Sequence, residues 1–66
     1  MYPHLKIIES VSGKFGIVIK GEVDGTYFKA TCSELENGKI LINEIETKGS
    51  TNVVKEVLIW YGHVDF

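Results

Sequence analysis

Residues 51–62 carry the repeat of an amphipathic helix, and such a helix needs an apolar surface to cover. At about 100° per residue the large apolar side chains fall on one stripe, Lys55 and Glu56 lie opposite, and only Ile59 departs. The stripe consists of Val53, Val54, Val57, Leu58, Trp60 and Tyr61. Ser50 and the two polar residues after it can cap the first amides, and Gly62 can end the helix in the left-handed conformation. We therefore expect a C-terminal helix that covers a sheet.

The same residues can also form a fifth strand that closes a small all-β barrel. Val53, Val54, Val57 and Ile59 are β-branched, and β-branched residues have reduced helix propensity. In a strand, however, both faces of this segment would carry large apolar groups and neither would be polar. The helical pattern is the stronger guide, so we prefer the helix.

The chain has 66 residues, which is enough for a single small domain spanning 1–66. A core of this size rarely contributes more than about 3–5 kcal/mol, so a further source of stability is expected. The single cysteine excludes an internal disulfide, and no dense set of metal ligands is apparent, which leaves self-association. One cysteine and the lack of an apolar run of about 18 residues favour a cytoplasmic protein with no membrane segment.

Apolar residues alternate with polar or small ones from Leu5 to Ile19, as in strands with one buried face. A three-residue loop over 11–13 would join two such strands and would place Ser10 opposite Lys14. That register sets Ile7 opposite Ile17 and Leu5 opposite Ile19.

Asp24-Gly25 has the composition of a two-residue type I′ hairpin turn. Counting back from it pairs residues that are all apolar or small, so turn chemistry and hydrophobic pattern select the same register. The expected pairs are Gly21 with Phe28, Ile19 with Ala30 and Ile17 with Cys32.

Asn37-Gly38 has a similar composition and predicts a second type I′ turn, with Glu36 and Lys39 as a cross-strand pair. Strict pairing beyond this turn sends Leu41, Asn43 and Ile45 inward and leaves Ile40 and Ile42 on the outer face. Two explanations remain open: a β-bulge near Asn43, or a strand that is covered on both sides.

The resulting prediction is an α+β fold, a four-stranded antiparallel β-meander with one C-terminal helix packed on one face. Trp60 is expected at the margin of the core. The predicted core is Leu5, Ile7, Phe15, Ile17, Ile19, Phe28, Ala30, Cys32, Leu41, Ile45, Val53, Val54, Val57, Leu58 and Tyr61.

The opposite face of this sheet collects large apolar groups among its charged residues. Contiguous exposed apolar patches usually mark association surfaces, although scattered single ones are normal. The candidate interface residues are Ile8, Val18, Tyr27, Ile40 and Ile42. Tyr27, an aromatic group with a polar end, is the preferred anchor.

Residues with possible chemical roles have simpler structural explanations. His4, His63 and Asp65 can form a metal site if the termini meet, but solvated terminal histidines explain them as well. Cys32 is expected in the core, where a thiol is unreactive. The GxxG sequence at 13–16 lies between predicted strands, whereas a KH-type RNA clamp lies between helices. We therefore expect no catalytic, metal or cofactor site and no enzyme.

The first functional hypothesis is a small non-enzymatic interaction protein, a regulator, inhibitor or assembly factor that binds a protein partner and self-associates. An alternative is a nucleic-acid or nucleotide binder that uses Lys6, Lys20, Lys29 and Tyr27 on the exposed sheet. A net charge of −2 and the absence of arginine disfavour it. A third possibility, an acidic mimic of nucleic acid, would require a continuous lysine-free stripe of carboxylates.

Overall fold

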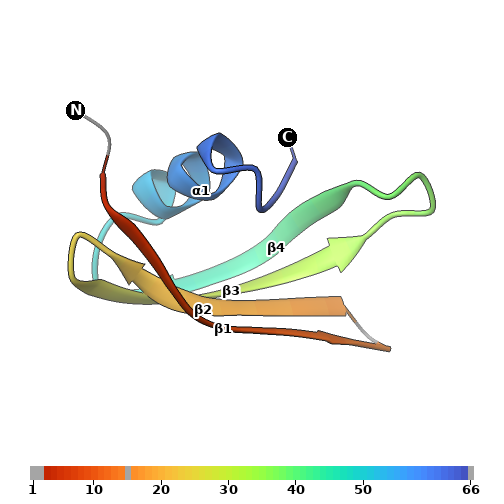
Figure 1. Cartoon of the computed structure of the whole chain (residues 1–66), viewed down its shortest axis with the longest axis horizontal. Helices are drawn as coiled ribbons and strands as arrows, with labels where there is room; N and C mark the ends of the chain where they lie inside the picture. Colours follow the sequence, from red (N-terminus) through yellow and green to blue (C-terminus); the bar gives the residue numbers. More distant parts are fainter. Residues whose placement is uncertain (1–2, 15, 66) are drawn as a thin grey trace.

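The computed structural model describes residues 3–14 and 16–65, and it confirms a four-stranded antiparallel meander followed by one helix. The elements are β1 (Leu5–Gly13), β2 (Gly16–Val23), β3 (Thr26–Glu34), β4 (Ile40–Thr47) and α1 (Thr51–Trp60). The strands lie in the order β1-β2-β3-β4, so β1 and β4 are the edge strands (Figure 1). Residues 53–60 are helical, so the barrel alternative is wrong.

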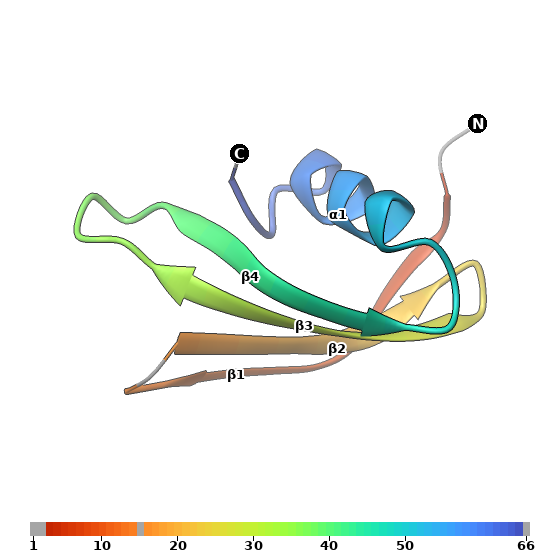
Figure 2. The same cartoon turned by 180° about the vertical axis from the view of Figure 1, so that it is seen from behind.

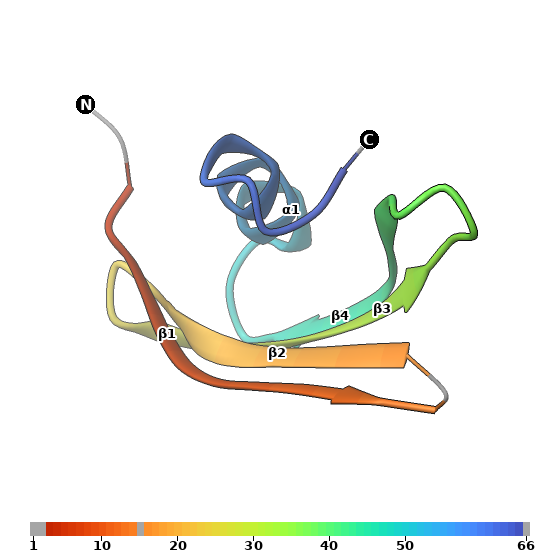
Figure 3. The ribbon, with the colours of Figure 1, turned by 45° about the vertical axis from the view of Figure 1, so that its right-hand side comes forward.

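The sheet is strongly curled, and α1 lies in the trough that it forms (Figure 3). The start of the described chain at Pro3 and its last described residues, after α1, lie on the helix side of the sheet (Figure 2). We call the face toward α1 the inner face and the opposite one the outer face. The curl brings the first part of β1 up beside the helix, where the Tyr61 hydroxyl donates to the Pro3 carbonyl at 3.2 Å.

The ends of α1 are capped by the residues that the sequence suggests. The Ser50 side chain accepts a hydrogen bond from the Val53 amide at 3.3 Å. At the other end Gly62 has a φ of 79°, and the amides of Gly62 and His63 donate to the carbonyls of Ile59 and Leu58. This double bond pattern is a Schellman motif. It turns the chain back onto the sheet, and Val64 becomes part of the core.

The β2–β3 hairpin has the predicted turn and the predicted register. Asp24 and Gly25 have φ values of 50° and 82°, as a type I′ turn requires. All of the expected pairs are present: Gly21 with Phe28, Ile19 with Ala30, and Ile17 with Cys32.

The predicted register of β1 on β2 is wrong. Strand β1 continues to Gly13, which pairs with Gly16, so residues 11–13 are strand and not loop. Ser10 therefore faces Ile19 and not Lys14, Ile7 faces Gly21, and Leu5 faces Val23. Ile8 is an extra residue between the pairs of Ile7 and Glu9, a β-bulge that reverses the alternation along the strand.

Two glycines of β2 permit a close approach of neighbouring backbone. A Cβ on Gly16, which has a φ of 135°, would collide with the Cys32 carbonyl oxygen. A Cβ on Gly21 would collide with the Lys6 carbonyl oxygen and lie 3.1 Å from the Phe28 ring. Glycine at both positions therefore lets β2 lie close to the backbone of β1 and β3.

The turn between β3 and β4 is not of type I′. Gly38 has a φ of 86°, whereas Asn37 has no positive φ. The Gly38 amide donates to the Leu35 carbonyl, and the Leu35 amide donates to the Lys39 carbonyl. This pattern is a type I turn followed by a left-handed glycine, the usual three-residue loop. Leu35, not Glu36, therefore faces Lys39.

A bulge at Asn43 decides which residues of β4 face the helix. Glu44 pairs with Thr31 and Ile42 pairs with Cys32, so Asn43 is the extra residue. The bulge explanation is confirmed, and the placement of Ile40 and Ile42 on the outer face is wrong. Both pack against the core, whereas Leu41 pairs with Ser33 on the outer face.

The core is formed by the inner face, α1 and the C-terminal tail. Its buried residues are Ile19, Val23, Phe28, Ala30, Cys32, Val54, Val57, Leu58 and Val64, with Leu5, Ile7, Ile17, Ile40, Ile42, Ile45 and Ile59 packed against them. Val53 and Tyr61, predicted core residues, are 41% and 51% exposed, and Trp60 is 63% exposed. The buried stripe is thus narrower than the apolar one. Phe15, another predicted core residue, lies outside the described residues.

Two aspartates each hold the backbone of a distant residue. The Asp24 amide donates to the His4 carbonyl, and the Asp24 carboxylate accepts from the His4 amide. In the same way the Asp65 amide donates to the Ile40 carbonyl, and the Asp65 carboxylate accepts from the Ile40 amide. The second contact covers the start of the β4 edge. No corresponding segment covers the β1 edge beyond Glu9 among the described residues.

Candidate interaction surface

Three apolar side chains gather on the outer face near the β1 edge. Ile8 and Val11 are 56% and 51% exposed, and Val11 faces Val18 across β1 and β2. None of the three belongs to the core cluster or packs against it. We call Ile8, Val11 and Val18 the outer patch.

The β-bulge at Ile8 assembles this patch. Ile7 packs against the core, whereas Ile8, the extra residue of the bulge, is 56% exposed and does not. Because the bulge adds one residue, Glu9 and Val11 also face outward, opposite Lys20 and Val18. The expected interface residues Ile8 and Val18 thus lie near the same edge of the sheet, with the Glu9–Lys20 pair between Ile8 and the Val11–Val18 pair. Val11 was not among the residues expected from the sequence, because residues 11–13 were predicted to form a loop.

Tyr27, the preferred anchor, lies apart from the outer patch. It is 51% exposed and pairs with Glu22 near the β2–β3 turn. On β3, Lys29 lies between Tyr27 and Thr31, the residue opposite Val18. Of the five expected interface residues, the structure therefore places Ile8 and Val18 near the β1 edge with Glu9 and Lys20 between them, leaves Tyr27 farther away, and turns Ile40 and Ile42 inward.

The outer face carries charges of both signs side by side. Lys20 Nζ lies 3.6 Å from Glu9 Oε2, and Lys29 faces Glu46 across the strands. Lys20 and Lys29 also face each other, between the glutamates of β1 and β4. Among the described residues the carboxylates therefore form no lysine-free stripe, which a nucleic-acid mimic requires.

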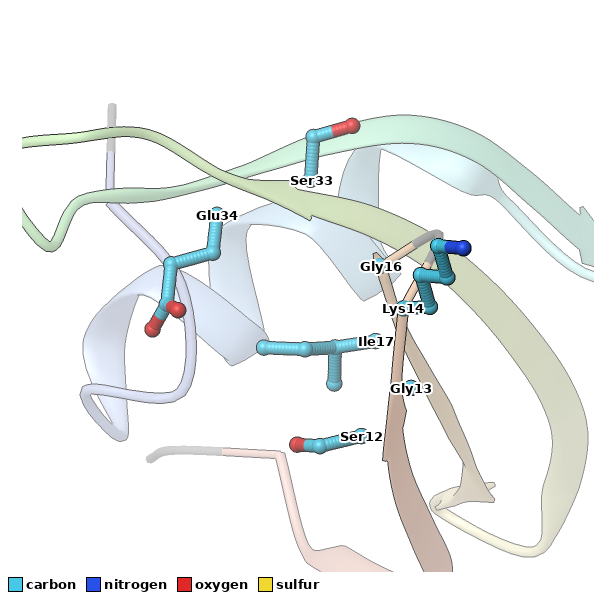
Figure 4. Close-up of a pocket in the computed structure, with 7 residues that line it drawn as sticks. All are labelled: Ser12, Gly13, Lys14, Gly16, Ile17, Ser33 and Glu34. Carbon is cyan, nitrogen blue, oxygen red and sulfur yellow. The ribbon is translucent and has the colours of Figure 1, made fainter.

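A hollow of about 290 Å³ lies at the end of the sheet that α1 does not cover (Figure 4). Its lining residues are Ser12, Gly13, Lys14, Gly16, Ile17, Ser33 and Glu34. The side chains of Ser12, Ile17 and Glu34 extend to one side of the strands, and those of Lys14 and Ser33 extend to the other. Among the described residues no histidine lines the hollow, so neither serine has the usual general base that would make it a nucleophile. Because α1 does not cover this end of the sheet, the inner face at the end of β1 is exposed to solvent as well.

Cys32 lies in the core with no exposed surface. Burial raises the pKa of its thiol above the ordinary value, because the thiolate loses solvation there. A protonated, buried thiol is a poor nucleophile. This environment agrees with the structural role expected for Cys32.

We expect Cys32 to react with a thiol reagent such as DTNB only when the protein opens. With a stability of about 3–5 kcal/mol, labelling at pH 8 should be at least about 100-fold slower than for an unfolded chain. The rate of DTNB labelling measured with and without urea gives the ratio of the two rates. The urea-unfolded chain is the control. Equal rates in the two conditions would contradict the burial of this thiol.

The residues proposed for a metal site do not assemble one. No group of three or more histidine, cysteine, aspartate or glutamate side chains in the described part of the chain is placed to hold a metal ion. The Asp65 carboxylate accepts from the Ile40 amide instead. Over residues 3–14 and 16–65, no helix has the length and apolar character needed to cross a bilayer.

Comparison of the chain with protein-family models, with curated proteins and with solved structures found no match.

Proposed function

We propose that this chain is a small non-enzymatic protein-interaction module, a regulator, inhibitor or assembly factor of the cytoplasm that binds a protein partner. The observation that supports it is the outer patch. Two of its side chains are more than half exposed on the sheet face that no helix covers. In a domain this small, most large apolar side chains are needed for the core, so exposed ones indicate an association surface.

The setting of the patch suits protein recognition. Interfaces combine an apolar centre with a polar rim. Here the apolar groups are Ile8 and the Val11–Val18 pair, and the polar groups beside them are the Glu9–Lys20 ion pair and Thr31. A protein partner with a complementary apolar group can cover the centre while these polar side chains remain hydrated.

Nucleic acid is the weaker alternative. A single-strand binder combines a positive groove with stacked aromatic groups. Lys20 is engaged by Glu9, Lys29 faces Glu46, and Tyr27 stands alone near the β2–β3 turn. The lysines therefore lie in a field of mixed sign that gives phosphate little attraction.

Lysine substitutions in the outer patch test the proposal. Immobilised Ile8→Lys and Val18→Lys chains should retain a specific protein partner from an extract of the source organism at least about tenfold less than the wild type, because each buries a charge in the interface. Val53→Lys is the matched control, since Val53 is a similarly apolar group 41% exposed on α1. Circular dichroism checks that every variant is folded.

Two results would contradict the proposal. One is partner capture that Val53→Lys weakens and both patch variants leave unchanged, since the contact would then involve the helix. The other is salt-sensitive retention of nucleic acid, with no protein retained, by the wild-type chain.

A further inference from the structure

One side of β1 is open to solvent, beside the outer patch. It is an edge strand, and Figure 3 shows no segment along the side of it that faces away from β2. Lys14 and Trp60 apart, no described residue outside β2 hydrogen-bonds to the backbone of residues 9–13. Glu9, Ser10, Val11, Ser12 and Gly13 are all exposed. An unprotected edge of this kind can accept another strand.

The register of the sheet shows which backbone groups of β1 point to the open side. Val23 and Thr26 flank a two-residue turn, so they form the hydrogen-bonded type of antiparallel pair. Alternation along β2 then directs the backbone groups of Val18 and Lys20 toward β1. Their partners on β1, Val11 and Glu9, are therefore bonded to β2.

Ser10 and Ser12 are the residues between these bonded pairs. Their amides and carbonyls consequently point away from β2, toward the open edge. Their side chains lie on the inner face, since Ser10 faces Ile19 and Ser12 faces Ile17. The open edge thus offers a regular donor and acceptor pattern over residues 10–12.

We infer that this edge pairs with the same edge of a second copy, antiparallel and about a two-fold axis through Val11. Ser10 of each copy then lies opposite Ser12 of the other, and each such pair exchanges two backbone hydrogen bonds. Val11 faces its own counterpart in the closer, non-hydrogen-bonded type of pair. The inference rests on the proposed function. It gives a geometry to the self-association that the sequence leads us to expect.

Side-chain chemistry favours this register. Glu9 lies opposite Gly13 of the second copy, so no like charges face each other. Ser10 and Ser12 place hydroxyls across from hydroxyls, a compatible cross-strand pair. Paired residues point to the same face, so the Val11 side chains meet on the outer face. The Val11–Val18 pairs of the two copies then form one apolar strip across the axis.

The length of the ladder limits the strength of the dimer. The Ile8 bulge interrupts regular pairing on one side, and β1 ends at Gly13 on the other. Bulges restrict edge pairing in this way. A ladder confined to residues 9–13 buries less than the roughly 1,200 Å² of a standard interface, so we expect a weak, reversible dimer with a Kd in the micromolar range or above.

Proline at position 12 tests the backbone bonds. Ser12→Pro removes an amide that points to the second copy and none that bonds β2, and prolines are tolerated at such edge positions. Sedimentation equilibrium of the purified chain from about 10 µM to 1 mM should show a dimer that Ser12→Pro weakens at least about tenfold, since two bonds are lost per dimer. Ser12→Thr keeps the amide and should retain the dimer. Circular dichroism confirms folding.

Variants with opposite charges at position 11 test the two-fold axis through Val11. Val11→Lys and Val11→Glu should each be monomeric, because like charges then face each other across the axis. Their equimolar mixture should restore association, because lysine then faces glutamate. The same exchange at Val18, which does not face its own counterpart, should give no restoration. This pattern of outcomes is specific to pairing about Val11.

A wild-type chain that stays monomeric to 1 mM would overturn the edge pairing. A dimer unchanged by Ser12→Pro, or one that the mixed charge variants do not restore, would overturn the register. In either case loss of partner capture by Val18→Lys would still support the proposed function, so the two failures can be told apart.

Discussion

Leu58→Ala should remove a large part or all of the free energy of unfolding at 25 °C. Leu58 has no exposed surface and packs in the core where α1 covers the sheet. Truncating a buried leucine to alanine costs about 2–5 kcal/mol. A domain of this size has about 3–5 kcal/mol in total, so the loss is comparable with the whole stability. Urea unfolding followed by circular dichroism measures the difference in the free energy of unfolding.

Val53→Ala is the matched control for that experiment. Val53 lies on the same apolar stripe of the sequence but is 41% exposed on α1. Alanine also has the higher helix propensity, so the free energy of unfolding should change by less than about 0.5 kcal/mol. If Val53→Ala and Leu58→Ala lowered the free energy of unfolding equally, both side chains would have to be equally buried. That result would contradict the orientation of α1 on the sheet.

Gly16→Ala should have the second largest effect. Its φ of 135° is unfavourable for residues with a Cβ, and the added Cβ would collide with the Cys32 carbonyl oxygen in the neighbouring strand. Backbone strain of about 1–3 kcal/mol adds to overpacking of about 1–3 kcal/mol. Thermal unfolding should show a fall in Tm of at least about 10 °C for a domain of this size.

Gly13→Ala separates that effect from the general cost of replacing glycine. Gly13 pairs with Gly16 across β1 and β2, but its nearest potential contact, the Gly16 carbonyl oxygen, lies 3.9 Å from the position of an added Cβ. Gly13 also has no positive φ. We expect Tm to change by only a few degrees. A Tm for Gly16→Ala as high as that of Gly13→Ala would show that the close approach of β2 and β3 is absent.

Local signals predicted the architecture well. The Asp24-Gly25 turn and the alternation on either side of it gave the β2–β3 register, because turn geometry and side-chain burial constrain the same pairing. The helical repeat after Ser50 predicted α1, its cap and its glycine terminator. These features depend on residues close in sequence, and their physical causes act over a few residues.

The candidate surface was predicted only in part, and two bulges explain why. One extra residue at Ile8 turned Val11 toward the outer face, and one at Asn43 turned Ile40 and Ile42 toward the core. A bulge moves every later side chain to the other face of the sheet. Its position depends on the partner strand, so alternation within one strand locates it poorly.

The sequence by itself determined the order of elements, the ends of the helix and the central hairpin. The tertiary structure alone decided which side of α1 is buried and which apolar residues remain on the outer face. The helix carries a wider apolar stripe than the curled sheet can cover, so Val53 and Trp60 stay exposed while Val64 enters the core. The conformational preferences of nearby residues specify each helix and strand. Which side of each element is buried depends on how the strands pair and how the helix packs on the sheet.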